Sequence, residues 1–180
     1  KIGLLLNKLK ELKLDDNTIV IFSSDNGPEL TGTKQWGHDN STGPGLNSYF
    51  SVGETAGLNG QKHSIFAGGV RVPFLVRWPG VVPAGRIDTT TALASVDILP
   101  TFAELAGITL PENYKPDGQS IVKAFKGEAF SRDKTIYWQW KSARDRPYFW
   151  ANAGIQEDNW RLLVNEELGK QELYNINSDW

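Results

Sequence analysis

The run Thr18–Phe22 limits the fold of this chain most strongly, because five consecutive β-branched or aromatic residues favour a strand over a helix. A continuously apolar strand is typical of a parallel sheet that is covered on both faces. The polar segment Ser23–Pro28 follows directly. In open α/β sheets the loops at the carboxyl ends of the strands hold the ligands, so this segment is well placed for chemistry.

The neighbouring segments complete an α/β pattern. Apolar residues at three- and four-residue steps between positions 2 and 12 predict an amphipathic helix with one buried stripe, which serves as the crossover before the strand. A second buried strand is expected over 72–78, with pairing that begins only after Pro73. A helix is expected over 97–107, with Pro100 in its first turn and Gly107 just past its end.

The last third of the chain has a different character. Four short aromatic or alternating segments near 134–140, 147–152, 159–164 and 171–176 predict a small antiparallel sheet. We therefore expect two domains, 1–127 as part of an α/β domain and 128–180 as the small β subdomain. Five tryptophans lie in this part: Trp138, Trp140, Trp150, Trp160 and Trp180. We expect their rings to fill the core of the sheet, and the alternative is a surface on which sugars stack.

Composition excludes several classes of protein. With 19 Lys and Arg against 21 Asp and Glu, the net charge of −2 argues against binding to nucleic acid or membranes through bulk charge. The 180 residues contain no Cys, so disulfides, thiolate metal sites and Cys nucleophiles are excluded, and no Met, which suggests a part of a longer protein. The apolar run at 2–14 is too short and too polar to span a membrane.

Asp25 and Asn26 are the first candidates for a binding site. They place one carboxylate and one amide oxygen side by side after a buried strand, and hard oxygen ligands favour Ca²⁺ or Mg²⁺ over zinc. The alternative interpretation is a simple turn, because Asp-Asn-Gly is a common turn sequence. Glu29 and Glu54 could add a carboxylate, although nothing in their spacing selects them.

Lys62 and His63 form the second candidate. A Lys in a cleft is a compact charge suited to an anionic oxygen, and the following Gly68-Gly69 pair allows a backbone path that a β-carbon would block. The alternative interpretation of Lys62 is a solvated side chain. We interpret Arg71 as a structural residue that ties down the loop. The segment 29–60, which contains His38, lacks periodicity and is expected to be a long functional loop.

These motifs together resemble the sulfatase family of the alkaline-phosphatase superfamily, on the arylsulfatase A and N-acetylgalactosamine-6-sulfatase side. The residues that carry the likeness are Ser24–Glu29, Gly60 with Lys62, Gly68–Phe74 and Arg77–Gly80. The resemblance implies the C-terminal part of an α/β sulfatase fold, a mixed sheet flanked by helices, with a small antiparallel sheet. Ala67 departs from the pattern, because relatives usually carry Glu there.

The resemblance also implies roles for individual residues. Asp25 and Asn26 would be two ligands of a single Ca²⁺, and Lys62 would be the catalytic residue that contacts the sulfate group, with His63 as a second substrate contact. The family's nucleophile, a formylglycine matured from Cys or Ser, has no counterpart in these residues and is expected upstream. The chain would then be inactive without the remainder of the same protein.

The expected function is therefore that of part of a sulfuric ester hydrolase that acts on sulfated carbohydrates or aryl sulfates, in a periplasmic, secreted or lysosome-like compartment. No nucleic acid and no membrane span is expected. Two alternatives remain. One is a non-catalytic fragment or carbohydrate-binding module. The other is a phosphodiesterase or phosphonate hydrolase of the same superfamily.

Overall fold

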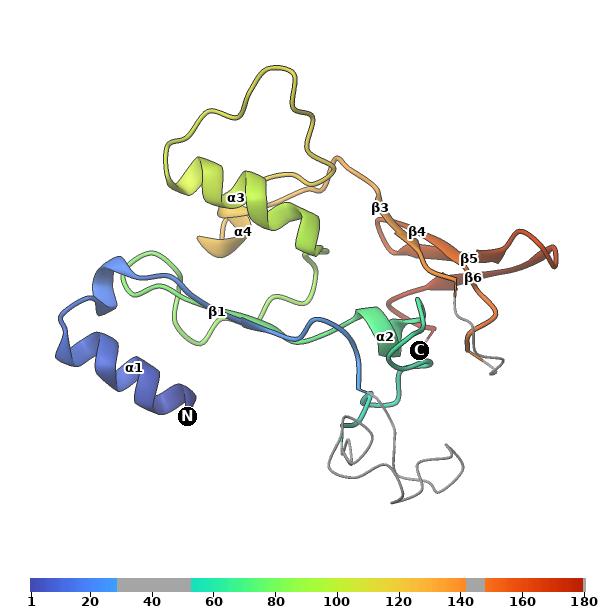
Figure 1. Cartoon of the computed structure of the whole chain (residues 1–180), viewed down its shortest axis with the longest axis horizontal. Helices are drawn as coiled ribbons and strands as arrows, with labels where there is room; N and C mark the ends of the chain where they lie inside the picture. The colour runs from blue at the N-terminus through green and yellow to red at the C-terminus, as the bar shows by residue number, and fades with distance from the viewer. Residues whose placement is uncertain (29–52, 142–147, 180) are drawn as a thin grey trace, which may run out of the picture. The chain divides into compact units, whose positions relative to one another are not determined.

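The computed structural model describes residues 1–28, 53–141 and 148–179. Figure 1 shows their helices and strands. The helices are α1 (Ile2–Glu11), α2 (Ala67–Val70), α3 (Ile98–Leu105) and α4 (Val122–Phe125). The strands are β1 (Val20–Ser23), β2 (Phe74–Arg77), β3 (Ile136–Gln139), β4 (Ala153–Glu157), β5 (Trp160–Asn165) and β6 (Lys170–Asn175). The α/β fold class and the separate small antiparallel sheet are thereby confirmed.

The chain forms two compact units. Unit 1 consists of Lys1–Ser23 and Phe74–Thr135, and unit 2 consists of Ser24–Pro73 and Ile136–Trp180. Residues 24–28 and 53–73 thus group with the C-terminal sheet in unit 2, although the expected domains were 1–127 and 128–180. That domain boundary stays a prediction, because compactness alone does not define a domain.

In unit 1, α1 ends at Glu11, and a 3₁₀ turn over Asp15–Asn17 leads into β1. The predicted helix is present, but its apolar stripe is not buried: Leu5 is 55% and Leu12 is 53% exposed, and no residue of α1 is fully buried. Periodicity reports which face of a helix is apolar, whereas burial also needs a partner for that face.

The strands β1 and β2 form an antiparallel pair, with Ile21 opposite Val76 and Phe22 opposite Leu75. The prediction that β1 pairs in parallel is therefore wrong for β2, its neighbour among the described strands. Burial on both faces is also wrong, because Phe22 is 50% and Leu75 is 56% exposed. Side chains alternate along a strand, so only one face of this pair meets the core of unit 1. The start of β2 at Phe74 confirms that pairing begins only after Pro73.

The core of unit 1 lies between this strand pair and α4. Ile121, Ala124 and Phe125 are buried, and Phe125 stacks on Phe74 with ring centroids 6.2 Å apart. The partly buried residues around them are Ile19, Ile21, Phe74, Val76, Val82, Leu93 and Phe130. The two strands are thus held by apolar contacts on one face.

The helix predicted over 97–107 is confirmed as α3, with Pro100 in its first turn and Gly107 in the left-handed region at φ +65°. Asp97 precedes it and is fully buried. Its carboxylate accepts two hydrogen bonds from Arg132, at 2.7 and 3.0 Å, and one each from the backbone N–H groups of Ala94 and Gln119. This ion pair ties three separate segments of unit 1 together.

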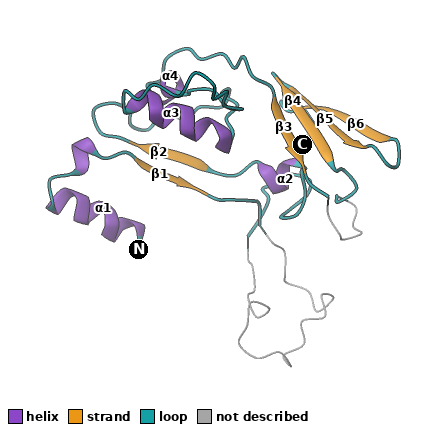
Figure 2. Cartoon of the chain, turned by 45° about the horizontal axis from the view of Figure 1, so that its top comes forward, coloured by secondary structure: helices purple, strands orange, loops and turns teal. Residues whose placement is uncertain are grey.

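Unit 2 contains the four-stranded antiparallel sheet in the order β3-β4-β5-β6 (Figure 2). Three of the four predicted strands are confirmed. The strand expected at 147–152 is wrong, because β4 begins at Ala153. Within the described part of that segment, Phe149 and Ala151 are buried without forming a strand, so their apolar character reflected core packing.

We predict that Asp97→Asn lowers the free energy of unfolding by about 3–5 kcal/mol, because the Arg132 guanidinium would stay buried without its counter-ion. Urea-induced unfolding measures the change. The matched control is Glu11→Gln, which breaks the exposed ion pair of Lys8 and Glu11 and should cost less than about 1 kcal/mol. Equal losses in the two variants would contradict this account of the buried pair.

Candidate functional site

The chain bends at Asp25 and Asn26, directly after β1, and we call residues 24–28 the acidic turn. The Ser24 hydroxyl donates a hydrogen bond of 2.8 Å to the Asn26 carbonyl oxygen, which stabilises the turn from within. Asp25 is exposed and Asn26 is half-buried. Within the described residues, neither of these two side chains forms a hydrogen bond or an ion pair. Their oxygens are therefore available to a ligand.

Two backbone hydrogen bonds join the acidic turn to residues 59–70, which we call the lysine loop. The N–H of Gly27 donates to the carbonyl oxygen of Gly69 at 2.7 Å, and the N–H of Lys62 donates to that of Pro28 at 3.0 Å. Both segments belong to unit 2. The structure thus brings the predicted metal ligands and the predicted anion-binding lysine into one local assembly.

Glycines make this close approach possible. A Cβ atom on Gly27 would lie 1.8 Å from the carbonyl oxygen of Gly68, and one on Gly68 would lie 2.3 Å from that of Gly60. A Cβ atom on Gly69 would lie 2.0 Å from the carbonyl oxygen of Ser64. All three distances are far below van der Waals contact. The expectation that a β-carbon would block the path of the Gly68-Gly69 pair is confirmed.

Lys62 and His63 occupy the outer part of the lysine loop, and both are half-buried. The N–H of Ser64 donates to the carbonyl oxygen of Gln61 at 3.0 Å, which closes a turn around the two residues. His63 has a φ of +72°, in the left-handed region that residues other than glycine rarely adopt. The turn therefore holds His63 in a strained backbone conformation.

Ser64 and Phe66 anchor the lysine loop to the rest of unit 2. The Ser64 hydroxyl donates to the carbonyl oxygen of Tyr148 at 2.8 Å and accepts from the N–H of Phe66 at 3.1 Å. The Phe66 ring makes edge contacts with Tyr148, Trp150 and Tyr174, at centroid distances of 5.6, 5.7 and 6.2 Å. The C-terminal sheet thereby fixes the position of the loop.

Arg161 is an unusual buried cation that the sequence interpretation did not single out. It is only 7% exposed, donates twice to the side-chain oxygen of Gln156, and lies 4.7 Å from the ring centroid of Trp138. Its Nη1 atom has no hydrogen-bond partner among the described residues. Burial, together with the charge of Arg71, lowers the pKa of Arg161 to about 10. The sequence around Arg161 predicts a strand but gives no indication that this side chain is buried.

The acidic turn fits a hard cation in the type of its ligands but not in their number. Ca²⁺ takes six to eight oxygen ligands, and the turn offers one carboxylate and one amide. Within residues 1–28, 53–141 and 148–179, no group of three or more His, Cys, Asp or Glu residues could hold a metal ion. Glu29 and His38 lie outside the described residues. A complete calcium site would need further ligands from outside the described residues.

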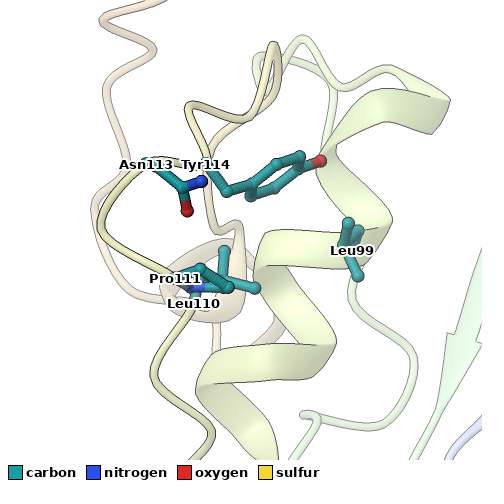
Figure 3. Close-up of a pocket in the computed structure, with 5 residues that line it drawn as sticks. All are labelled: Leu99, Leu110, Pro111, Asn113 and Tyr114. Atoms are coloured by element: carbon teal, nitrogen blue, oxygen red, sulfur yellow. The ribbon is translucent and has the colours of Figure 1, made fainter.

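A pocket of about 420 Å³ lies in unit 1, between α3 and the segment that follows it. Figure 3 shows its lining, with Leu99 on the helix and four residues on that segment: Leu110, Pro111, Asn113 and Tyr114. The lining is mostly apolar and contains no acid, base or predicted site residue. We therefore do not assign the chemistry of the chain to it.

Two family models match the chain. Residues 1–108 match the model described as Sulfatase. Residues 59–180 match the model described as N-sulphoglucosamine sulphohydrolase, C-terminal. The first match contains the acidic turn, and both contain the lysine loop.

Named relatives and a solved structure agree with these models. The chain is 32% identical over 143 residues to human steryl-sulfatase, across 79% of this chain and 22% of that protein. It is 33% identical over 138 residues to an N-acetylgalactosamine-6-O-sulfatase of Bacteroides thetaiotaomicron, across 77% of this chain and 25% of that protein. A structure from work on glycosaminoglycan metabolism in the same bacterium matches 99% of this chain and 36% of that one, with a TM-score of 0.69 at 26% identity.

The chain therefore spans between a fifth and about a third of the length of these curated relatives and this structure. Among the helices that the structure describes, none is both long enough and apolar enough to pass through a lipid bilayer.

We predict that Gly27→Ala destabilises the protein by about 1–3 kcal/mol, because the new methyl group would overlap the Gly68 carbonyl oxygen and force the two backbones apart. Urea-induced unfolding measures the loss. Gly3→Ala is the control, since no heavy atom lies within 4 Å of its added Cβ, and it should stabilise α1 by up to about 1 kcal/mol. Unchanged stability of Gly27→Ala would show that the two segments do not approach so closely.

Proposed function

This chain belongs to the sulfatase family, and from that premise we propose that the protein containing it hydrolyses sulfate esters of carbohydrates or aryl groups. The observation that carries the proposal is the direct backbone connection between the acidic turn and the lysine loop. It supports a site in which oxygen ligands and a cation act on one anionic group. The chain would contribute only part of this site, because it spans a minority of its relatives' length.

Asp25 and Asn26 are proposed as two ligands of a calcium ion. Their side chains have no other partner in the described structure, and their oxygens are of the kind that Ca²⁺ prefers. When bound, the ion would supply positive charge that stabilises the sulfate oxygens during the reaction. The remaining ligands are expected from parts of the protein outside the described residues.

Lys62 is proposed to bind a sulfate oxygen directly, with His63 as a second substrate contact. An ammonium group is a compact charge that can donate up to three hydrogen bonds to anionic oxygens. The hydrogen bonds of the loop fix the backbone of Lys62 relative to the acidic turn before substrate arrives. From that fixed backbone, the ammonium group would stabilise negative charge that develops on the ester oxygens.

The nucleophile is expected to be a formylglycine supplied by a segment upstream of this chain. The 180 residues contain no Cys, and no Ser in them stands in the family's nucleophile motif. We further propose an exported location, in the periplasm, in a lysosome-like compartment or outside the cell, as expected from the family resemblance.

We predict that Asp25→Ala and Lys62→Ala each lower the turnover of sulfate esters by the full-length protein at least about 100-fold, the scale expected for one preorganised electrostatic group. Release of inorganic sulfate measures the turnover. Calorimetric titration with Ca²⁺ should show weaker binding for Asp25→Ala and unchanged binding for Lys62→Ala. The matched controls are Asp117→Ala and Lys115→Ala, which remove an exposed acid and an exposed base of unit 1 and should leave both quantities unchanged.

Other results would favour the alternatives. Turnover close to that of the unmodified protein in either variant would remove that residue from the site. Faster hydrolysis of bis(4-nitrophenyl) phosphate than of 4-nitrophenyl sulfate would favour a phosphodiesterase or phosphonate hydrolase. Sugar binding without hydrolysis of any ester would favour a binding module.

A further inference from the structure

Trp140 differs in its surroundings from Trp138 and Trp150, two other tryptophans of unit 2. Those two pack against the buried core of the unit, whereas Trp140 follows β3 directly and is 49% exposed. Its backbone N–H donates to the carbonyl oxygen of Asn152 at 2.9 Å, so its position next to the sheet is well defined. The expectation that the tryptophans fill the core of the sheet is thus wrong for Trp140, and also for Trp160, which is 52% exposed; Trp180 lies outside the described residues.

Exposure of Trp140 alone would not indicate a binding site, because many single apolar side chains lie on protein surfaces. The residue next to Trp140 provides the further evidence. Its ring centroid lies 6.3 Å from that of His63, with 32° between the ring planes. His63 directly follows Lys62 in the lysine loop. An exposed indole therefore lies beside the turn that carries the proposed sulfate-binding residue.

The strain at His63 is a second, independent observation. A φ of +72° would suit glycine without cost, yet a large ring occupies this position. The surrounding turn maintains the conformation through Ser64, whose side chain is anchored on Tyr148. Backbone strain of this kind persists where the structure around it enforces it, and it is concentrated at ligand sites. The imidazole ring is thus held next to the indole at an energetic cost.

We propose that Trp140 and His63 form a stacking subsite for the sugar ring of a sulfated pyranose whose sulfate group Lys62 binds. The proposal rests on the function proposed above and names the substrate class of the same site. The C–H bonds on one face of a pyranose ring carry partial positive charge, and the negative face of an indole attracts them. An ammonium group beside this surface suits a ligand that combines an apolar ring face with an anion.

The polar atom of the Trp140 ring favours a sugar over an aryl group. The indole N–H can donate one hydrogen bond. A sugar hydroxyl group can accept it, whereas a simple aryl ring offers no such acceptor. Aryl sulfates would therefore depend on Lys62 and gain less from Trp140.

The test is a comparison of substrates in the full-length protein. The sugar substrates are N-acetylgalactosamine 6-sulfate and N-acetylglucosamine 6-sulfate, and the aryl substrate is 4-nitrophenyl sulfate. Trp140→Ala should lower kcat/KM for a cleaved sugar sulfate by about tenfold or more, mainly through KM, as expected for the loss of one stacking partner. For 4-nitrophenyl sulfate the loss should stay below about threefold, and Trp140→Phe should retain part of the preference for sugars.

Trp160→Ala is the matched control. Trp160 is 52% exposed, belongs to the same sheet, and pairs with Glu157 at the opposite end of β4 from Trp140. Its replacement should leave the ratio of sugar to aryl activity unchanged. Equal losses on both substrate classes in Trp140→Ala, no loss on the sugars, or the same loss in Trp160→Ala would overturn the proposal.

His63→Gly separates a ligand contact from a structural role. Glycine adopts the left-handed conformation without strain, so the melting temperature should stay the same or rise while the preference for sugars falls. A lower melting temperature with an unchanged preference would assign His63 to the fold and overturn its place in the subsite.

Calorimetric titration with the two sugar sulfates keeps this proposal separate from the proposed function. If the unmodified protein hydrolyses no sulfate ester, the proposed function fails, and binding still decides on the subsite. Binding that weakens at least about tenfold in Trp140→Ala supports the subsite. Equal binding in the two proteins, or no binding by the unmodified protein, overturns it.

Discussion

Two backbone hydrogen bonds between the acidic turn and the lysine loop are the interaction on which the candidate site depends. They join Gly27 to Gly69 and Lys62 to Pro28, and they form because the glycines let the two backbones approach within a distance that any side chain would prevent. Contact through the backbone fixes the relative position of the two backbone segments that carry Asp25 and Lys62.

The C-terminal sheet is the foundation of this arrangement. Phe66 inserts between aromatic rings of the sheet and the segment before β4, and the buried Ser64 hydroxyl bonds to the backbone of the same segment. Apolar burial provides most of the free energy, and the hydrogen bond defines the register of the loop. The C-terminal sheet and the segment before β4 thus fix the position of the loop that carries Lys62 and His63. The exposed ring of Trp140, directly after β3, lies beside His63.

The sequence predicted the type of the elements better than their surroundings. The position of α3 followed from its Pro and Gly, and the start of β2 followed from Pro73, because these residues act through their own backbone. Burial of α1 and of both faces of β1 was expected and is not found, since burial depends on what lies opposite a face. The prediction of a strand at 147–152 was wrong for a related reason: Phe149 and Ala151 are buried there without pairing with another strand.

The chemical groups available at the site could be read from the residues alone: one carboxylate and one amide after a strand, a lysine before a Gly-Gly pair, and no thiol anywhere in the 180 residues. Which of these groups lie together became clear only from the folded chain. It placed the acidic turn against the lysine loop and set Trp140 beside His63, and among the described residues the side chains of Asp25 and Asn26 have no hydrogen-bond partner. The physical reason is that residue types act locally, whereas proximity arises from hydrogen bonds and packing between segments far apart in the chain.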